Sequence, residues 1–325
     1  MQRLTSLFAR RLDDERGAAA VVLSLLLVPM LGFAAIAVDI GALYAERARL
    51  QVGADAAAIA VAQDCSRGNC GDMLATAQAL ITANDTEGTA ARPVLSSDPL
   101  SVTVTGGTPK EHWFAPVIGH ESTRVSATAT VGWGSPSGGT AVLPLAFSWC
   151  SFKAQTGGGL PSTTTQQTIR LSKTADAPQC VGPSGLNIPG GFGYLVTDPG
   201  TCEVTSALDE WMYSDTGNGP PSACESEHFA AFLGREVLLP VYDEVDGQGT
   251  SGRYRVHGYA AFHLTGYHLV PGTFSTANKL CGQGQGSNNV RCVTGYFTRF
   301  VELSDAWTFS PTAPAMGSSI LRLIR

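Results

Sequence analysis

The feature that most constrains this chain is an uncharged stretch of 21 residues, Ala18 to Val38, which Asp39 follows directly. As a helix it would be about 31 Å long at roughly 1.5 Å per residue, enough to cross a hydrocarbon layer of roughly 30 Å. A removable signal peptide is the alternative, because Ala35-Ile36-Ala37 resembles a small-x-small cleavage site. The stretch is longer than a usual signal sequence and the helical pattern continues past that point. We therefore predict a retained transmembrane helix over residues 18–38.

The charges that flank this stretch predict its orientation. Positive residues stay on the cytoplasmic side of a membrane, and acidic residues count for little in this rule. Four arginines precede the stretch and two follow it closely, namely Arg3, Arg10, Arg11 and Arg16 before it and Arg47 and Arg49 behind it. We expect residues 1–17 to be cytoplasmic and everything after residue 38 to be extracytoplasmic.

All eight cysteines lie beyond the predicted span. An even set confined to one side of a membrane is typical of an oxidising compartment and of disulfides. Local spacing favours sequential pairs, Cys65 with Cys70, Cys150 with Cys180, Cys202 with Cys224, and Cys281 with Cys292. A zinc site is the alternative, but the sequence has no C-x-x-C pair and no tight cluster of cysteine and histidine. We predict no metal ligand and no cofactor.

The helix is predicted to continue beyond the membrane from Asp39 to Gln63. This segment has no proline and is rich in alanine, the strongest helix former. Arg47, Gln51 and Asp55 stand four residues apart and would form a polar stripe beside an apolar face. That face would pack on a partner helix or on the chain's own later domain, and a stalk without a specific partner is the alternative.

Two short segments carry a resemblance to a known family. Residues 38–44 read Val-Asp-Ile-Gly-Ala-Leu-Tyr, and residues 49–60 read Arg-Leu-Gln-Val-Gly-Ala-Asp-Ala-Ala-Ala-Ile-Ala. With Arg16-Gly17 and Pro29, this pattern resembles the N-terminal TadE/TadG-like segment of TadG-like proteins of the Flp (tight adherence, Tad) pilus assembly system. A second patch, Trp113-Phe114 through Gly119, resembles the F-x-x-x-x-G turn that these proteins place before a closing strand.

The resemblance implies a bitopic envelope protein that serves pilus assembly or adherence and has no catalytic residues. Partner contacts are then expected along the anchoring helix, at Asp39, Gly41, Tyr44, Gln51 and Asp55. Pilin-like relatives carry a glutamate five residues after a glycine cleavage site, but Val22 stands there after Gly17. The D-x-S-x-S metal motif of some TadG proteins is also missing from the sequence, so we expect neither this processing nor that metal site.

The rest of the chain is predicted to make the protein α+β, with a β-rich, disulfide-braced ectodomain. Residues 39–133 would form a helical stalk with a small strand subdomain, because a helix over 72–83 precedes alternating stretches at 100–105 and 123–133. Glycine, serine and proline at 134–140 are interpreted as a linker. Residues 141–325 would form an antiparallel sandwich or barrel, with strands at 167–172, 235–241, 254–269, 295–303 and 319–324 and short helices at 203–213 and 225–233.

The strand predicted at 254–269 has two chemically different faces. Side chains alternate across a sheet, so Phe262 and Leu264 share the face that we assign to the core. Tyr259 and Tyr267 share the other, more polar face. Cross-strand packing explains these tyrosines most simply, and stacking on a sugar or on a partner is the alternative.

Motifs for catalysis and for nucleic-acid binding are missing from the sequence. It contains no Gly-x-Ser-x-Gly, His-Glu-x-x-His or P-loop pattern. Asp243, Glu244 and Asp246 lack the spacing of a calcium loop, and we interpret them as a polar hairpin turn. The net charge is −6 and no basic cluster follows the span, which argues against a phosphate backbone as ligand.

These observations predict a non-catalytic, single-pass protein of the cell membrane that supports Flp-type pilus assembly or adherence through protein contacts. Its expected partners are the lipid bilayer and other pilus assembly proteins or pilins, and self-association is left open. A membrane-anchored adhesin or ligand-binding module is the rival interpretation. An exposed aromatic patch around Tyr259 and Tyr267 would favour that rival.

Overall fold

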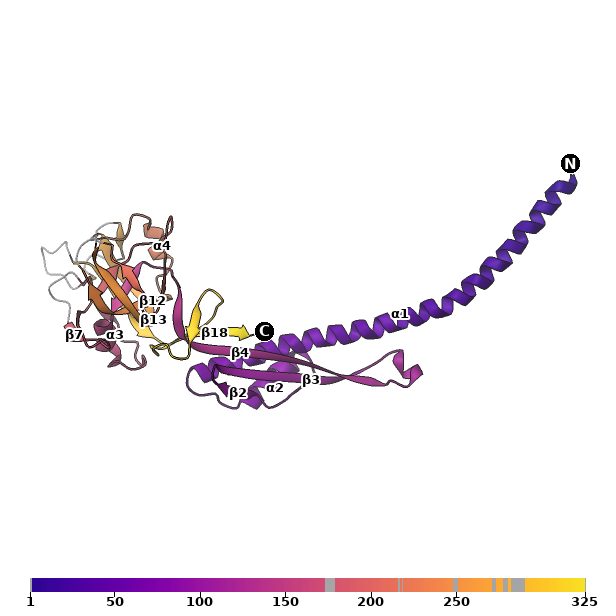
Figure 1. Cartoon of the computed structure of the whole chain (residues 1–325), viewed down its shortest axis with the longest axis horizontal. Coiled ribbons are helices and arrows are strands. Elements are labelled where there is room, and N and C mark those ends of the chain that lie inside the picture. The colour runs from indigo at the N-terminus through magenta and orange to yellow at the C-terminus, as the bar shows by residue number, and fades with distance from the viewer. Residues whose placement is uncertain are drawn as a thin grey trace. The chain divides into compact units, whose positions relative to one another are not determined.

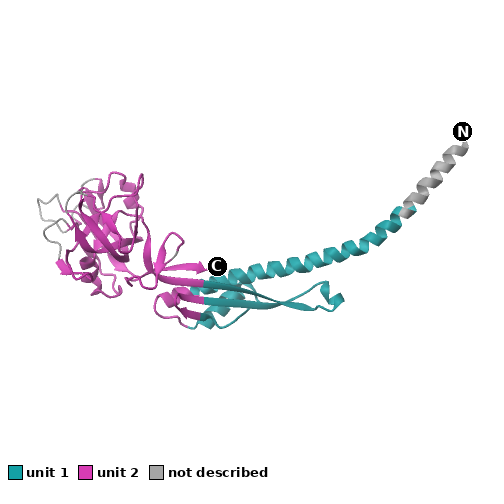
Figure 2. Ribbon diagram, viewed as in Figure 1, with its two compact units in different colours: residues 1–60, 72–94, 103–130 teal, residues 61–71, 95–102, 131–325 magenta. Residues whose placement is uncertain are grey.

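The computed structural model describes the whole chain except residues 1, 173–178, 216, 218, 248–250, 271–272, 277–279, 282–289 and 325, with only the backbone given for residues 2–16, 18 and 303. The chain divides into two compact units (Figure 2). The first comprises residues 1–60, 72–94 and 103–130, and the second comprises residues 61–71, 95–102 and 131–325. A long apolar helix followed by β-rich structure confirms the α+β class.

One continuous helix, α1 (Gln2–Ser66), contains the predicted span and its continuation (Figure 1). Its most apolar window has a mean hydropathy of 2.6 and is long enough to cross a membrane. Large apolar side chains of this part are exposed, including Val28 at 71% and Phe33 at 73%. Such a continuous apolar surface is what a lipid-facing helix presents. The helix ends three residues beyond the predicted Gln63.

The first unit adds a short helix and a small sheet to α1. Helix α2 (Met73–Asn84) begins where the Asp72 side chain accepts a hydrogen bond from the Ala75 N–H, at 3.0 Å. In the sheet, β3 (Leu100–Glu111) lies between β1 (Thr89–Ala90) and β4 (Ser122–Ala141), and β2 (Val94–Ser97) also pairs with β3. The predicted helix at 72–83 and the strands at 100–105 and 123–133 are confirmed, although both strands are longer than predicted.

Small residues allow α2 to lie close to α1. Leu50, Ala54 and Ala57 on α1 are fully buried, as is Ile81 on α2. A Cβ atom added to Gly53 would lie 3.3 Å from the Ile81 Cα, so the two helix backbones approach closely there. The alanine-rich continuation of α1 therefore packs on the chain's own first unit along this face.

The second unit is built around one long strand, β13 (Arg253–Val270). Antiparallel neighbours flank it on both sides, and its sheet has the strand order β6-β15-β13-β12-β5-β9, with β11 and β14 also paired to β13. The other members are β5 (Leu145–Ser148), β6 (Gln167–Arg170), β9 (Phe192–Tyr194), β11 (Trp211–Tyr213), β12 (Glu236–Asp246), β14 (Phe274–Ser275) and β15 (Cys292–Thr298).

A second group of strands in this unit is built on the later part of β4. Strands β10 (Val204–Ala207), β17 (Thr308–Ser310) and β18 (Ser318–Ile324) pair with β4, and β16 (Phe300–Leu303) pairs with β18. The pairs β16·β18 and β5·β12 are parallel. The sheets of this unit are therefore mixed, where the turn-rich sequence had predicted an antiparallel arrangement.

Both faces of β13 are buried from Gly258 to Phe262. Phe262 belongs to a core that also contains Phe147 and Phe297, whereas Tyr259 belongs to a second core with Trp307. Tyr259 is 0% exposed and its hydroxyl lies 2.9 Å from the Ser206 hydroxyl. The face assigned to the core is buried, as predicted. The other face is half-buried at His257 and His263 and exposed at Thr265, but it is not polar around Tyr259, because the strand is covered on both sides there.

Tyr267 was assigned to the wrong face. The register of β13 against β15 shifts between Leu264 and Gly266, which marks a β-bulge or a similar irregularity. An extra residue of this kind reverses the alternation beyond it. Tyr267 is consequently 4% exposed and lies in the same core as Leu264.

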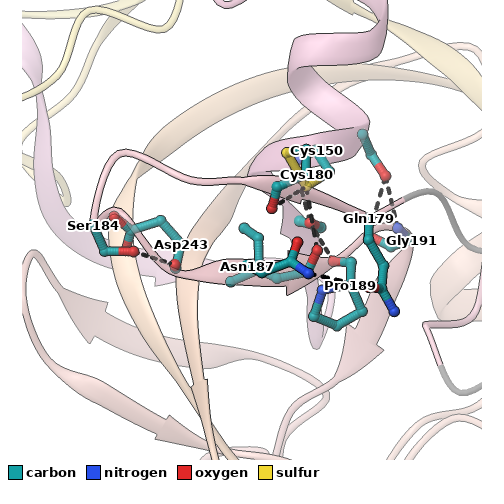
Figure 3. Close-up of a disulfide and its surroundings, with 11 residues drawn as sticks. Cys150, Gln179, Cys180, Ser184, Asn187, Pro189, Gly191 and Asp243 are labelled. Carbon is teal, nitrogen blue, oxygen red and sulfur yellow. Dashed lines mark hydrogen bonds between the residues drawn. A yellow bond between two sulfur atoms is a disulfide. The ribbon is translucent and has the colours of Figure 1, made fainter.

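All four predicted disulfides are present: Cys65–Cys70, Cys150–Cys180, Cys202–Cys224 and Cys281–Cys292. The second, shown in Figure 3, joins helix α3 (Trp149–Thr156) to strand β7 (Gln179–Val181). Within the part of the chain that the structure describes, strand β7 pairs only with β8 (Asn187–Pro189), in a separate two-stranded sheet. The disulfide therefore holds a small hairpin to α3, where sheet hydrogen bonds do not reach.

The prediction of a linker at residues 134–140 was wrong, because these residues lie within β4. The glycines there provide room for packing. A Cβ atom added to Gly139 would lie 2.5 Å from the Trp307 ring, and one added to Gly134 would lie 2.9 Å from the Phe309 ring. A glycine cluster can mark close approach inside a strand as well as a turn.

Three other predicted segments differ from the structure. Residues 203–213 form β10 and β11 instead of a helix, because β10 pairs with β4 and β11 pairs with β13. The predicted helix at 225–233 shortens to α4 (Ser226–Ala230). The predicted strand at 295–303 is divided between β15 and β16, which belong to different sheets.

Candidate functional site

Asp39 joins α1 to the end of the β3–β4 hairpin. The Asp39 side chain accepts hydrogen bonds from the backbone N–H groups of Trp113 at 2.9 Å, Phe114 at 3.2 Å and Ala115 at 2.8 Å. Only 6% of Asp39 is exposed. An acid immediately after the apolar stretch is thus an internal ligand for backbone groups of the hairpin.

The hairpin end has the turn that the resemblance implied. Phe114 precedes a short 3₁₀ turn, η1 (Ala115–Ile118), and Gly119 closes it with a φ of 89°. This left-handed conformation favours glycine because a Cβ atom would be strained there. Residues 114–119 therefore form the predicted F-x-x-x-x-G turn.

The hydrogen bonds at Asp39 keep its carboxylate charged. Desolvation acts to raise the pKa of Asp39, but the N–H donors of Trp113, Ala115 and Phe114, together with the charge of His112, outweigh it and lower the pKa below its usual value. The charged form is the one that accepts these three bonds. The hairpin end and α1 are therefore held together at neutral pH.

A second acid on the same side of α1 faces the hairpin. Glu46 follows Asp39 by seven residues, or two helical turns, and is 4% exposed. The Lys110 ammonium on β3 lies 2.7 Å from the Glu46 carboxylate, and the Arg49 guanidinium lies 3.9 Å from it. Asp39 and Glu46 together fix the register of the hairpin along α1.

Gln51 and Asp55 also face the hairpin. The Gln51 amide donates to the Asp55 carboxylate at 2.8 Å and to the Thr128 carbonyl of β4 at 3.2 Å. Thr128 and Thr105 in turn share a hydrogen bond between their hydroxyls, at 2.9 Å. The structure therefore engages three of the five predicted contact residues, Asp39, Gln51 and Asp55, in internal bonds.

Gly41 and Tyr44, the other two predicted contact residues, are exposed, although Tyr44 also lines a groove that α1 makes with residues 123–126 of β4. Tyr44 is 71% exposed, and a Cβ atom added to Gly41 would meet nothing within 4 Å. We use the name outward face for the exposed side of α1 made by Gly41, Ala45, Ala48 and Val52. These residues recur at spacings of four, three and four, so they lie along one line of the helix. The outward face is uncharged and built mainly from small side chains.

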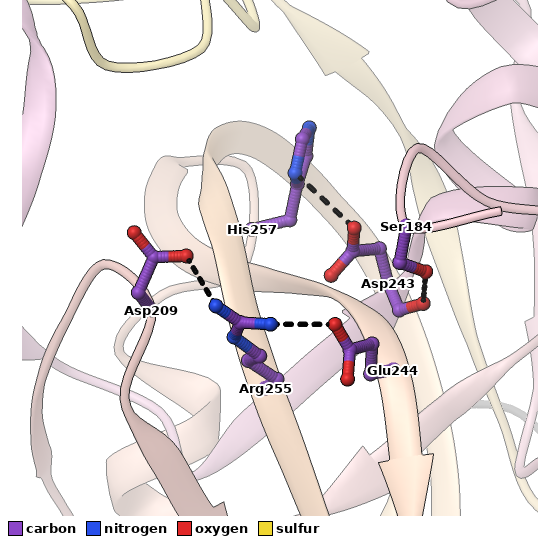
Figure 4. A network of polar contacts seen from close by, with 6 residues as sticks. All are labelled: Ser184, Asp209, Asp243, Glu244, Arg255 and His257. Carbon is purple, nitrogen blue, oxygen red and sulfur yellow. Dashed lines mark hydrogen bonds and ion pairs between the residues drawn. The ribbon is translucent and has the colours of Figure 1, made fainter. Parts of the chain in front are cut away.

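The second unit contains a polar network around the end of β12 (Figure 4). The His257 ring lies 3.4 Å from the Asp243 carboxylate, and Arg255 lies 2.7 Å from Glu244 and 3.1 Å from Asp209. Asp243, Glu244 and Asp246 were interpreted as a hairpin turn, but they lie within β12, where Glu244 and Asp246 pair with residues of β13 and Asp243 lies at a shift of the register. The Arg253 guanidinium forms a similar ion pair with the Asp246 carboxylate, at 2.7 Å.

This network has the properties of structural ion pairing. Desolvation raises the pKa of Asp243 and lowers the pKa of His257, so burial disfavours the charge on both partners. The Ser184 hydroxyl donates to the backbone carbonyl of Asp243, at 2.7 Å, and so ties its loop to β12 (Figure 4). Within the described residues no group of three His, Cys, Asp or Glu side chains could hold a metal ion.

The observation that would favour the rival interpretation, an adhesin or ligand-binding module, is not made. An exposed aromatic patch was expected around Tyr259 and Tyr267 in that case, and both tyrosines are buried. Among the predicted contact residues, only Gly41 and Tyr44 remain exposed on α1. The candidate functional site of the described chain is therefore this exposed side of the helix, which begins where the apolar span ends.

These features define a class: a membrane-anchored protein whose single apolar helix continues into a compact first unit and whose second unit is β-rich and braced by disulfides. Residues 17–64 of the chain match the family model described as "Putative Flp pilus-assembly TadE/G-like". The match confirms the TadE/G-like resemblance over the helix. No curated protein and no solved structure matches the chain.

Sequence reasoning missed Glu46, Lys110 and most of the outward face. Glu46 had a detectable signal, because an acid on the apolar side of a predicted helix has to find a partner when it is buried. The position of Lys110 depends on the register of a hairpin whose strands were predicted too short. Of the outward face, Gly41 was predicted as a contact residue, but Ala45, Ala48 and Val52 were not.

Proposed function

We propose that this chain is a single-pass envelope protein that supports the assembly of a Flp-type pilus through helix–helix contacts. In this proposal its N-terminus is cytoplasmic, its disulfide-braced units are extracytoplasmic, and it catalyses no reaction. The partners are pilus assembly proteins or pilins that present an apolar helix of their own.

The observation that carries the proposal is the position of the TadE/G-like match. Residues 17–64 begin just before the apolar stretch and end two residues before the end of α1. The similarity to pilus-assembly proteins therefore covers the apolar anchor and its helical continuation. A function that the match supports is expected to use this helix.

The outward face of α1 supports a helix as the partner. Gly41, Ala45 and Ala48 carry little or no side chain, and small residues let two helix backbones approach closely. The face carries no charge to desolvate, and Tyr44 stands exposed beside it. Val52, the last residue of the outward face, lies about 21 Å beyond Val38 at roughly 1.5 Å per residue. This end of the face is therefore well outside the span.

The proposed orientation rests on two independent features. Arginines are more numerous before the span than close behind it, as expected for a cytoplasmic N-terminus. All four disulfides lie behind the span, and disulfides persist in oxidising compartments.

The experiment is a deletion of the reading frame followed by counting of surface filaments by electron microscopy. We expect filaments to be lost and to return when the intact gene is supplied on a plasmid. Immunoblots against pilin should show that the subunit still accumulates, which separates an assembly defect from a loss of pilin. Unchanged filament numbers in the deletion strain would refute the proposal.

A further inference from the structure

We propose that the tip of the β3–β4 hairpin, residues 113–118, inserts into the membrane beside α1. The tip would lie between the lipid acyl chains of the leaflet in which the span of α1 ends. The tip would make a second membrane contact beside the helical anchor. This inference requires only that α1 spans a bilayer, and it does not depend on a role in pilus assembly.

The tip presents large apolar side chains to its surroundings. Val117 is 90% exposed, Ile118 is 74% exposed and Trp113 is 73% exposed, and Phe114 is exposed to 48%. Residues 113–119 contain no charged side chain. An apolar cluster of this kind on an extracellular loop is unfavourable in water, and a membrane is one environment that would cover it.

The position of the tip along α1 identifies that environment. The tip and the span line one groove with a volume of about 620 Å³, to which Leu31, Gly32, Ala35 and Ile36 contribute from α1 and Phe114, Val117 and Ile118 contribute from the tip. Leu31 precedes Asp39 by eight residues, or about 12 Å along the helix. The tip thus lies beside the last part of the stretch that must cross the hydrocarbon layer (Figure 1).

Four backbone N–H groups of the tip, those of Trp113, Phe114, Ala115 and Val117, have the internal partners that entry into lipid requires. A polar backbone group in hydrocarbon needs an internal partner, because no water is present there. The N–H groups of Trp113, Phe114 and Ala115 donate to Asp39, and Pro116 has no N–H group. The N–H of Val117 donates to the Phe114 carbonyl at 3.2 Å, as those of Gly119 and His120 do to the Pro116 and Ala115 carbonyls at 3.1 Å.

The residues that flank the tip fit the headgroup region. Lys110, Glu111 and His112 lead into the tip, and His120 and Glu121 follow it. Trp113 stands at this boundary, and tryptophan is enriched at membrane interfaces. Charged residues therefore stand on both sides of an apolar tip, which is the order expected if only the tip enters the membrane. Asp39 lies at the base of the tip, where the apolar stretch of α1 ends.

The test uses the full chain reconstituted into phosphatidylcholine vesicles. A fluorescent amino acid replaces Val117. In a matched control it replaces Val52, which is exposed on α1 but lies far beyond the span. Quenching is measured with lipids brominated on their acyl chains and with aqueous iodide. We expect bromolipid to quench the probe at 117 at least twofold more than the probe at 52, and iodide to give the opposite order.

Two results would overturn the proposal. Equal quenching at 117 and 52 would place the tip in water, and a probe at 117 that neither quencher reaches would mean that protein, such as a second copy of the chain, covers it. Replacing Asp39→Asn should lower bromolipid quenching at 117, because the amide cannot accept from all three N–H groups. Unchanged quenching in this variant would refute the role of Asp39 in holding the tip at depth.

Discussion

Ile81 and Gly106 should behave as a coupled pair in the packing that joins α2 to the sheet of the first unit. Ile81 is fully buried, and a Cβ atom added to Gly106 would lie 2.6 Å from the Ile81 Cδ1 atom. The next nearest atoms of Ile81, Cγ1 and Cγ2, would lie at 3.4 and 3.5 Å. Removing Cδ1 therefore makes room for one methyl group at Gly106.

This geometry sets the size of each effect. Ile81→Val alone should cost about 0.5–1.5 kcal/mol through the lost methyl group and the small cavity. Gly106→Ala alone should cost about 1–3 kcal/mol, because the added methyl overpacks a filled site. In the double variant the new methyl occupies the vacated space, so the total should fall below the sum of the two single costs by about 1–2 kcal/mol.

Hydrogen exchange of the α2 peptide, residues 73–84, read by mass spectrometry on the full chain in detergent micelles, gives the free energy of local opening for the four proteins of this cycle. The expected result is that the double variant protects α2 better than Gly106→Ala alone. Costs that add to within about 0.5 kcal/mol would show that the two sites do not share this space and would refute the packing argument.

Lowering the pH and removing a disulfide provide two further predictions. Because the folded-state pKa of Asp39 is lowered, its stabilisation of the hairpin end is complete above the pKa of an unfolded aspartate and is lost as the pH falls through the lower folded value. Hydrogen exchange at residues 113–115, corrected for intrinsic rates, should show this release, and Asp39→Asn should remove the pH dependence. Replacing Cys150 and Cys180 together by alanine should cost about 3–4 kcal/mol in the denaturation of the second unit, from the chain entropy of a loop closed across 30 residues. A loss below about 1 kcal/mol would mean that the hairpin of β7 and β8 is held by other contacts.

Much of the fold could be predicted because the relevant signals are local. The span from Ala18 to Val38 depends only on length and charge, and the start of α2 depends on the Asp72 cap beside it. The disulfides were predictable because each cysteine pairs with its neighbour in the chain. Features set by distant residues were not predictable, such as the passage of residues 134–140 through β4, where the glycines make room for Trp307 and Phe309.

The candidate site was only partly predictable for the same reason. The resemblance selected the helix over which the family model matches, but sequence alone does not tell which side of a helix the chain's own hairpin will cover. Asp39 and Gln51 were predicted as partner contacts because they belong to the segments that carry the family resemblance. The hairpin instead uses them as internal ligands, and the small residues on the opposite side remain available.

We propose that the outward face of α1 makes the contacts on which pilus assembly depends. Ala48→Arg places a large cation on this face without filling any core, because Ala48 is exposed and arginine is a good helix former. Ala79→Arg is the matched control, since Ala79 is an exposed alanine of α2 in the same unit. The direct measurement is the number of surface filaments, counted by electron microscopy on deletion cells that carry either variant at equal protein levels. We expect few filaments with Ala48→Arg and normal numbers with Ala79→Arg. Normal numbers with both variants would refute this role of the outward face.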